Sequence, residues 1–257
     1  MNIVVLMKQV PDLVEELEVD AGGTLLDRAW LRFITSEYDD HALEQALLLK
    51  EQHGGTVRVF ALDMGEADEM LFTALAKGAD SAVKLSGDFA TGIDSHSTAG
   101  IYRHALEGAS FDLILTGVQA IDDLDGPAGA MLATHLGLPY IGVVSGIDVD
   151  TANGEAHVRK EYPGGLLAEF TVDLPAVIGI QAAMQPPRYV PISRIRQTTK
   201  TAHIDETAAQ GERIVGAISV ERMYKPERAG SATMLEGSVD SIAERLLDIL
   251  TEHGIGR

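Results

Sequence analysis

One segment, residues 111–139, limits the possible fold more than any other part of the chain. Its apolar run at residues 113–115 predicts a buried parallel strand, and the pattern at residues 127–136 predicts a helix. Pro127 suits the first position of that helix, and Gly137 suits the position just after its end. A strand that opens onto a helix N-terminus is where α/β sheets bind anions and nucleotides. The segment therefore predicts an α/β fold with a ligand site at this turn.

The turn between this strand and this helix is acidic. It contains Asp122, Asp123 and Asp125, followed by Gly126. The carboxylates suit ribose hydroxyls or a cation better than the bare phosphate that a helix N-terminus attracts. A plainer interpretation is that Asp125 only caps the helix. From this turn alone, both interpretations stay open.

The composition excludes several classes of function. The 257 residues include 39 acidic and 20 basic side chains, and this formal charge of −19 argues against nucleic acid as a partner. The absence of cysteine excludes disulfides, thiolate zinc sites and cysteine-ligated iron–sulfur clusters, so a redox role would need an organic cofactor. The eight histidines lack metal-binding spacing and no nucleophile motif is present, so we expect neither a metal site nor a catalytic residue.

The sequence also bears on location. Its apolar runs have the length of strands, so no membrane insertion is expected. Met1 leads directly into an apolar run, without the charged segment and cleavage site of a signal peptide. We therefore expect a soluble, cytoplasmic protein.

Strand-like and helical patterns alternate through the first half of the chain. The expected strands are residues 3–7, 57–62, 82–85 and 111–115, and the expected helices are about residues 40–52, 65–77, 97–107 and 127–136. This alternation predicts a parallel sheet with helices on both faces. The turns after Met7, Leu62 and Leu115 should then meet in one crevice. The first of these turns, residues 8–12, carries candidate site residues but lacks the glycine-rich motifs of dinucleotide-binding folds and of ATP pyrophosphatases.

The chain changes character after Pro139. The four strands expected there form an antiparallel addition to the sheet, and they are residues 142–149, 156–161, 167–172 and 176–180. A further β excursion is expected at residues 14–34, where Gly22 and Gly23 form a turn. A proline-rich loop at residues 181–191 precedes a basic cluster, which is either a solvated face or a partner surface.

The C-terminal part predicts an extended arm. Residues 201–237 lack the pattern of a core, so we expect them to be disordered or laid over a partner. Ser238 then caps a helix whose apolar stripe needs a surface to cover it, either in this chain or in another subunit. The expected domains are therefore an α/β domain at residues 1–196, and an arm with an amphipathic helix at residues 197–257.

Several stretches, taken together, resemble the β subunit of electron transfer flavoprotein. Their order and spacing over residues 1–196 carry the resemblance, and they are KQVPD at residues 8–12, YDDHALEQA at residues 38–46, TALAKGAD at residues 73–80, GVQAIDD at residues 117–123, residues 158–175, and PRY at residues 187–189. The resemblance implies a parallel, Rossmann-like sheet of the adenine nucleotide alpha hydrolase-like type. It also implies a heterodimer in which the α subunit carries the redox-active FAD.

The resemblance further implies an adenine nucleotide, usually a structural AMP, in the crevice of this subunit. The positions that match this cofactor pocket are Leu6, Ser36, Glu37, Tyr38, Asp39, Met64, Gly117, Gln119, Asp122, Asp123, Asp125, Gly126, Pro127 and Ala128. Such a subunit carries electrons from flavin dehydrogenases, for example of the acyl-CoA dehydrogenase type, to a quinone-linked oxidoreductase or another acceptor.

Two further surfaces follow from the resemblance. Lys160 and Glu161 match a pair that faces the flavin-bearing domain, and Leu13 stands where many members have an aromatic residue beside the flavin. Residues 182–196 match the recognition loop that docks dehydrogenases, with Ile192 as its apolar anchor. The other docking residues implied in this loop are Arg188, Tyr189, Arg194 and Arg196.

The turn at the start of the predicted helix departs from both nucleotide-binding types in the family. AMP-binding members have Asn-Gln-Thr-Gly there, whereas this chain has Asp125, Gly126, Pro127 and Ala128, and Pro127 removes a backbone N–H from the phosphate cradle. Bifurcating members, which bind a second FAD, have a Gly-Asp-Thr-Ala-Gln-Val-Gly type of turn that this chain also lacks. AMP and a second FAD, and hence a simple carrier and a bifurcating, NADH-dependent protein, stay open.

Two alternatives come from other classes of protein. A nucleotide-binding regulatory protein of the universal-stress type would share the crevice, but it would explain neither the antiparallel addition nor the arm. A nucleotide-dependent enzyme related to ATP pyrophosphatases would need a phosphate loop after the first strand, which this chain lacks.

Overall fold

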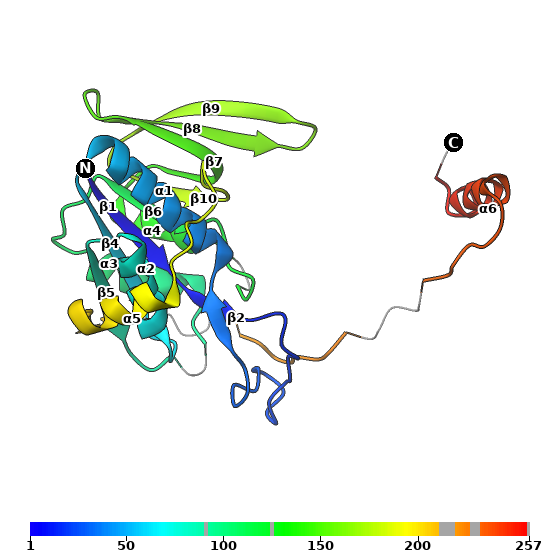
Figure 1. Cartoon of the computed structure of the whole chain (residues 1–257), viewed down its shortest axis with the longest axis horizontal. Helices are drawn as coiled ribbons and strands as arrows, with labels where there is room; N and C mark the ends of the chain where they lie inside the picture. The colour runs from blue at the N-terminus through cyan, green and yellow to red at the C-terminus, as the bar shows by residue number, and fades with distance from the viewer. Residues whose placement is uncertain (90–91, 124–125, 211–218, 227–231, 256–257) are drawn as a thin grey trace. The chain divides into compact units, whose positions relative to one another are not determined.

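The computed structural model describes residues 1–89, 92–123, 126–210, 219–226 and 232–255 (Figure 1). The chain divides into two units, Met1–Met223 and Tyr224–Arg257. Each unit is described by itself.

The first unit is built on a nine-stranded sheet of the described residues, in the order β11-β5-β4-β1-β6-β10-β7-β8-β9. The strands are β1 (Asn2–Met7), β4 (Thr56–Leu62), β5 (Ser81–Ser86), β6 (Leu113–Gly117), β7 (Tyr140–Asp150), β8 (Glu155–Tyr162), β9 (Leu166–Asp173), β10 (Ala176–Ile180) and β11 (Asp205–Ala208). Neighbours from β11 to β7 pair in parallel, whereas β7, β8 and β9 pair antiparallel. The α/β fold with a mostly parallel sheet is confirmed.

The place of β10 corrects one prediction. Residues 176–180 were expected in the antiparallel addition, but β10 lies between β6 and β7 and runs parallel to both. All five of its residues are buried. A strand without polar positions needs cover on both faces, which the centre of a parallel sheet provides and an edge ribbon does not.

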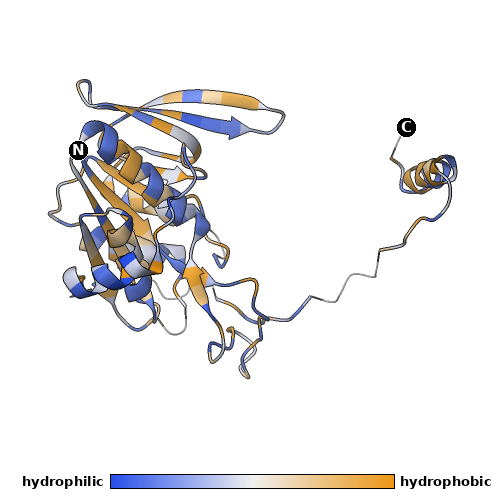
Figure 2. Cartoon of the chain, viewed as in Figure 1, coloured by the Kyte–Doolittle hydropathy of each residue, from blue (hydrophilic) through white to orange (hydrophobic). Residues whose placement is uncertain are grey.

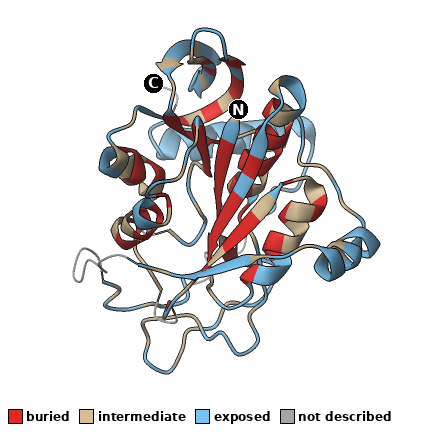
Figure 3. Cartoon of the chain, turned by 90° about the vertical axis from the view of Figure 1, so that its left-hand side faces the viewer, coloured by how far each residue is buried: buried red, intermediate tan, exposed pale blue. Residues whose placement is uncertain are grey.

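Four helices cover the two faces of the sheet. Side chains of α1 (Glu37–His53) and α2 (Ala67–Lys77) join one core cluster, and those of α3 (Ser95–Ala105) and α4 (Ala128–Leu136) join the other. Alternate residues of β1 divide between the two clusters, because successive side chains of a strand point to opposite faces. Hydrophobic and buried positions accordingly run along the central strands and the helix sides that face them (Figures 2 and 3).

Helix α1 has the charge pattern that a helix favours. Its first turn contains Glu37, Asp39 and Asp40, and its last turn contains Lys50 and His53. Acidic groups near the N-terminus and basic groups near the C-terminus both stabilise the helix dipole. Gly54 ends the helix with a φ of 70°, a conformation that glycine adopts without strain.

The β excursion at residues 14–34 has little regular structure. The short strands β2 (Gln9–Pro11) and β3 (Phe33–Thr35) pair antiparallel at its base, and one bridge joins Val19 to Leu26. Most of the segment between them is therefore loop, which differs from the longer strands that its alternating pattern predicts.

The chain beyond residue 180 contains more structure than the sequence predicts. Helix α5 (Ile192–Thr201) begins inside the stretch that was expected to be a recognition loop up to residue 196. Strand β11 then pairs in parallel with β5 at the edge of the sheet. The first unit therefore continues past residue 196, where the arm was expected to begin, and reaches Met223.

The second unit contains the amphipathic helix that the sequence predicts. Helix α6 (Val239–Glu252) begins after Ser238, whose side chain accepts a hydrogen bond from the backbone N–H of Ser241. Its apolar residues Val239, Leu246, Leu247 and Leu250 are exposed within the described residues. Across the described residues, no helix combines the length and the apolar character needed to cross a membrane.

Replacing Leu115 with alanine in β6 should destabilise the fold. Leu115 is 0% exposed, and emptying a core site of this kind costs about 2–5 kcal/mol of unfolding free energy. Leu166→Ala is the matched control, because Leu166 is 68% exposed at the start of β9 and should change that free energy by less than about 0.5 kcal/mol. Urea denaturation of both variants checks this difference, and equal losses would contradict the described core.

Candidate functional site

A pocket opens at the carboxyl ends of β1, β4 and β6. Strands β1 and β6 are neighbours at the point where the connections leave to opposite sides of the sheet. Ligands of open α/β sheets bind at such a switch point. The turns after Met7, Leu62 and Leu115 meet there, as the sequence predicts. The residues that line the pocket are Leu6, Met7, Lys8, Asp39, Leu62, Met64, Ile93, Ser95, Thr98, Tyr102, Thr116, Gly117, Gln119, Ala120, Asp123, Gly126, Ala128 and Gly129.

The carboxylate of Asp39 joins the ends of the two central strands. It accepts hydrogen bonds from the backbone N–H groups of Lys8 and Gly117, both at 2.8 Å. Burial raises the pKa of Asp39 to about 7, because removal from water disfavours the charged form more than these two N–H groups and the Lys8 ammonium favour it. The carboxyl group is therefore a structural link in the wall of the pocket.

Gly117 is required by this arrangement. A Cβ atom at this position would lie 2.5 Å from Oδ1 of Asp39 and 2.7 Å from Cβ of Tyr38. Any larger residue would push α1 away from the end of β6, and the hydrogen bond between Gly117 and Asp39 would be lost.

Lys8 neutralises two of the carboxylates on the acidic turn. Its ammonium lies 2.7 Å from Oδ1 of Asp122 and 2.8 Å from Oδ1 of Asp123. Burial lowers the pKa of Lys8, but these two carboxylates outweigh that effect and raise it. Oδ2 of Asp123 also accepts a hydrogen bond from the N–H of Ala120 at 2.8 Å, so the turn is folded around this carboxylate.

The described part of the acidic turn does not form a cation site. Among the described residues, no group of three or more potential ligands could hold a metal ion. Asp125, which was expected either to bind the ligand or to cap the helix, lies outside the described residues.

The N-terminus of α4 faces the same pocket. Pro127 occupies the N-cap position instead of the predicted first helical position, so α4 begins one residue later than predicted, and no side chain of the described residues caps the helix there. Gly126 precedes it with a φ of 67°. The first N–H groups of such a helix attract an anion.

A buried hydroxyl adds to this anion-binding character. Oγ1 of Thr116 has no hydrogen-bond partner among the described residues, although it is buried. A Cβ atom at Gly129 would lie 2.9 Å from that hydroxyl, so glycine leaves the space beside it open. An unpaired buried hydroxyl beside an uncapped helix N-terminus fits the phosphate of a nucleotide.

The predicted pocket residues divide into two groups. Those that line the pocket are Leu6, Asp39, Met64, Gly117, Gln119, Asp123, Gly126 and Ala128. Those that support or flank it are Ser36, Glu37, Tyr38, Asp122 and Pro127, of which Ser36 donates its backbone N–H to the carbonyl of Lys8 at 2.9 Å.

Sequence analysis missed the wall that α3 and the residues before it provide. Ile93, Ser95, Thr98 and Tyr102 line the pocket there. The connection from β5 to α3 leaves from the same carboxyl end of the sheet as the other turns. This position in the predicted topology could have indicated that α3 lines the pocket. Thr116 was also missed, although it directly precedes Gly117.

The remaining predicted residues lie outside the pocket. Lys160 and Glu161 belong to β8, where the Lys160 ammonium sits 5.5 Å from the centre of the Tyr162 ring. Leu13 is exposed. Tyr189, Ile192, Arg194 and Arg196 are exposed before and on α5, whereas Arg188 is held in ion pairs with α1.

Comparison with known proteins decides the family. The model of the electron transfer flavoprotein domain matches residues 26–211. The chain belongs to the electron transfer flavoprotein β-subunit family. It is 33% identical to the electron transfer flavoprotein subunit beta of Methylophilus methylotrophus over 98% of both chains. It is also 29% identical to the subunit of that name from Bacillus subtilis over 97% of both chains, and 32% identical to the protein FixA of Azorhizobium caulinodans over 96% of this chain and 92% of FixA.

Family membership extends the similarity to the C-terminal part, since the alignments cover almost the whole chain. It also displaces the two alternatives, the universal-stress-type regulator and the pyrophosphatase relative. Members of the family are electron-transfer subunits of flavoproteins, and the pocket of this chain lies at the carboxyl ends of β1, β4 and β6, where α/β sheets bind ligands.

The raised pKa of Asp39 makes a prediction about stability and pH. Between the ordinary value of 3.8 and about 7, the folded state holds a proton that the unfolded chain has released, so unfolding free energy falls as pH rises. Asp39→Asn lacks this titration. The stability of the unsubstituted protein relative to the variant should therefore decrease over that pH range, as measured by urea denaturation at successive pH values. A constant difference would show that Asp39 is ionised throughout.

Proposed function

We propose that this chain is the β subunit of a heterodimeric electron transfer flavoprotein, and that it holds AMP in the pocket described above. Its α subunit carries the redox-active FAD, which supplies the electron chemistry when bound. The observation that carries the proposal is the unpaired Thr116 hydroxyl beside the N-terminus of α4, in a chain that belongs to the electron transfer flavoprotein family. The carrier acts outside the membrane, in the cytoplasm.

The pocket residues divide the work of binding AMP. The hydroxyl of Thr116 and the first N–H groups of α4 hold the phosphate, although Pro127 removes one donor from the cradle. Asp123 and Gln119 line the pocket and would hold the ribose hydroxyls through hydrogen bonds. Leu6 and Met64 provide apolar contact for the base.

The antiparallel strands β8 and β9 face the flavin-bearing domain of the α subunit. On β8 and β9, Lys160 and Glu161 supply charge, while Leu166 and Leu167 are exposed apolar residues. Glu161 and Leu167 are paired across the two strands. Leu13 contributes to the same interface, and the apolar face of α6 is covered by the α subunit.

The docking surface for electron donors and acceptors lies at the start of α5. Ile192 is 64% exposed and Tyr189 is 84% exposed, beside the basic side chains of Arg194 and Arg196. An apolar anchor with positive charge around it suits a pocket with an acidic rim on a flavin dehydrogenase or a quinone-linked oxidoreductase. Such a contact exchanges quickly, which a carrier needs.

A bifurcating protein with a second FAD in the pocket is the other candidate function. The observation that favours it is Pro127 at the N-cap of α4, because a proline there weakens the phosphate cradle of the AMP type. The two candidates predict different nucleotide contents.

Extraction of the nucleotides from the co-produced heterodimer tests the proposal. One FAD and one AMP per heterodimer are expected, whereas two FAD would favour bifurcation and a colourless homodimer would reject the flavoprotein assignment. Thr116→Val keeps the shape of the side chain but removes the hydroxyl. The variant should therefore bind AMP about five- to thirtyfold more weakly and retain less of it. Unchanged AMP with Thr116→Val would remove Thr116 from the phosphate site.

Ile192→Ala should weaken electron transfer from a flavin dehydrogenase while the heterodimer keeps its FAD and AMP. Removing an anchor residue costs more than about 1 kcal/mol of binding, so the KM for the heterodimer should rise at least about fivefold. Gln197→Ala is the control, because Gln197 is exposed on α5 but is not among the neighbours of Ile192 on the helix surface. Stopped-flow reduction kinetics check both variants, and equal KM values would remove the anchor role.

A further inference from the structure

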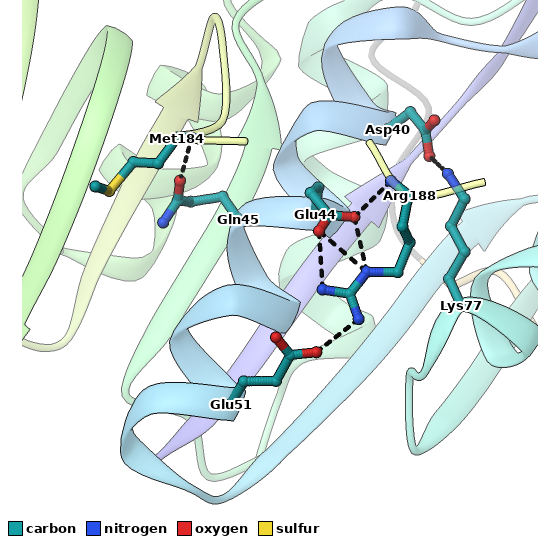
Figure 4. A network of polar contacts seen from close by, with 7 residues as sticks. All are labelled: Asp40, Glu44, Gln45, Glu51, Lys77, Met184 and Arg188. Atoms are coloured by element: carbon teal, nitrogen blue, oxygen red, sulfur yellow. Dashed lines mark hydrogen bonds and ion pairs between the residues drawn. The ribbon is translucent and has the colours of Figure 1, made fainter. Parts of the chain in front are cut away.

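Three side chains of α1 hold the segment that leads to α5. The backbone N–H of Ala183 donates to Nδ1 of His41 at 3.2 Å, and that of Met184 donates to Oε1 of Gln45 at 3.0 Å. The backbone N–H of Arg188 donates to Oε2 of Glu44 at 2.9 Å. Residues 183–188 therefore use side chains of a helix as acceptors for these N–H groups, in place of a backbone partner. Figure 4 shows the contacts of Met184 with Gln45 and of Arg188 with Glu44.

Arg188 makes the strongest of these contacts. Its Nε lies 3.0 and 2.9 Å from the two carboxylate oxygens of Glu44, and its second terminal nitrogen lies 2.8 Å from Oε1 of Glu44. The other terminal nitrogen lies 2.6 Å from Oε1 of Glu51 (Figure 4). Hydrogen bonds to Glu44 and Glu51 raise the pKa of Arg188, so the guanidinium stays charged.

The burial of Glu44 makes this pair different from an ordinary surface ion pair. Its side chain is only 4% exposed, and its two oxygens receive both the backbone N–H and the guanidinium of Arg188. A buried carboxylate without its partner is strongly destabilising, whereas an exposed pair contributes little. The segment therefore has one favourable position on α1.

We infer that Glu44 and Arg188 are positioning residues that fix residues 183–188 on α1 and thereby present Tyr189 and Ile192 at a constant place. Arg188 therefore acts within this chain and is not a contact for the dehydrogenase. The inference rests on the docking surface proposed above. A surface held in its bound arrangement before encounter avoids the entropy cost of ordering a loop, which raises affinity without new contacts.

The experiment compares variants of the heterodimer formed with the α subunit. Arg188→Met removes the guanidinium, and the double variant Glu44→Gln with Arg188→Met also avoids an unpaired buried carboxylate. Arg188→Lys keeps the charge but loses the two-pronged geometry. The matched control is Lys50→Met, which removes a 2.7 Å ion pair between the same helix and Asp80. The Lys50 ammonium also donates to the carbonyl of Gly78, and both of these partners lie outside residues 183–188.

Two measurements are made on each variant. Amide hydrogen exchange reports whether the N–H groups of Ala183, Met184 and Arg188 remain protected. Reduction kinetics with a flavin dehydrogenase give the KM for the heterodimer and kcat separately. Nucleotide content is measured as well, because the pocket lies at the other end of α1 from Glu51.

The expected result is at least about tenfold faster exchange at these amides and at least about a tenfold higher KM in Arg188→Met and in the double variant. The kcat and the nucleotide content should remain within about twofold, Arg188→Lys should be intermediate, and Lys50→Met should change neither measurement. A general loss of stability would also change kcat and the nucleotide content, so it would not produce this combination of results.

Three other results would overturn the inference. A higher KM with unchanged exchange would mean that Arg188 contacts the dehydrogenase itself. Faster exchange with an unchanged KM, while Ile192→Ala raises the KM, would mean that the segment does not position the anchor. If Ile192→Ala also leaves the KM unchanged, the proposed docking surface fails separately, and unchanged exchange in Arg188→Met would still show that Glu44 and Arg188 do not fix residues 183–188 on α1.

Discussion

The carboxylate of Asp39 is the interaction on which the architecture of the pocket depends. Two neighbouring parallel strands, β1 and β6, end at Met7 and Gly117, and the N–H groups of Lys8 and Gly117 at these ends point toward Asp39. Asp39, in the first turn of α1, accepts a hydrogen bond from each of them. Because Gly117 leaves no room for a side chain, the helix lies directly against the strand ends. The wall of the crevice is thus set by one buried acid and one glycine.

Helix α1 serves three parts of the molecule at once. Ala42, Leu43 and Leu47 pack into the core, while Asp39 closes the pocket. On another side of the helix, His41, Glu44 and Gln45 accept the N–H groups of residues 183–188. Spacings of three and four residues place these acceptors on adjacent turns, so one helix connects the wall of the pocket to the segment before α5. The proposed AMP site and the proposed docking surface would therefore both depend on the position of this helix.

The basic side chains fall into two groups, those paired with acids of this chain and those exposed on α5. Lys8 is matched by Asp122 and Asp123, and Arg188 is matched by Glu44 and Glu51. The acids come from segments far along the chain in both cases. Arg194, Arg196 and Lys200 are instead exposed on α5 of a protein whose formal charge is −19. A local positive region on an acidic protein steers partners of opposite charge toward one face.

The sequence by itself determined the alternation of strands and helices, the crevice where the turns after Met7, Leu62 and Leu115 meet, and the family. Hydrophobic periodicity and the position of strand ends are local properties, so they can be read from a linear pattern. Only the tertiary structure decided that β10 enters the centre of the sheet, that residues 192–201 are helical, and that α3 and Thr116 complete the pocket. It also decided that Arg188 binds α1, since that pair joins residues 144 positions apart and no local pattern records such a contact. Long-range pairing depends on how the elements pack, and packing is settled by the whole chain together.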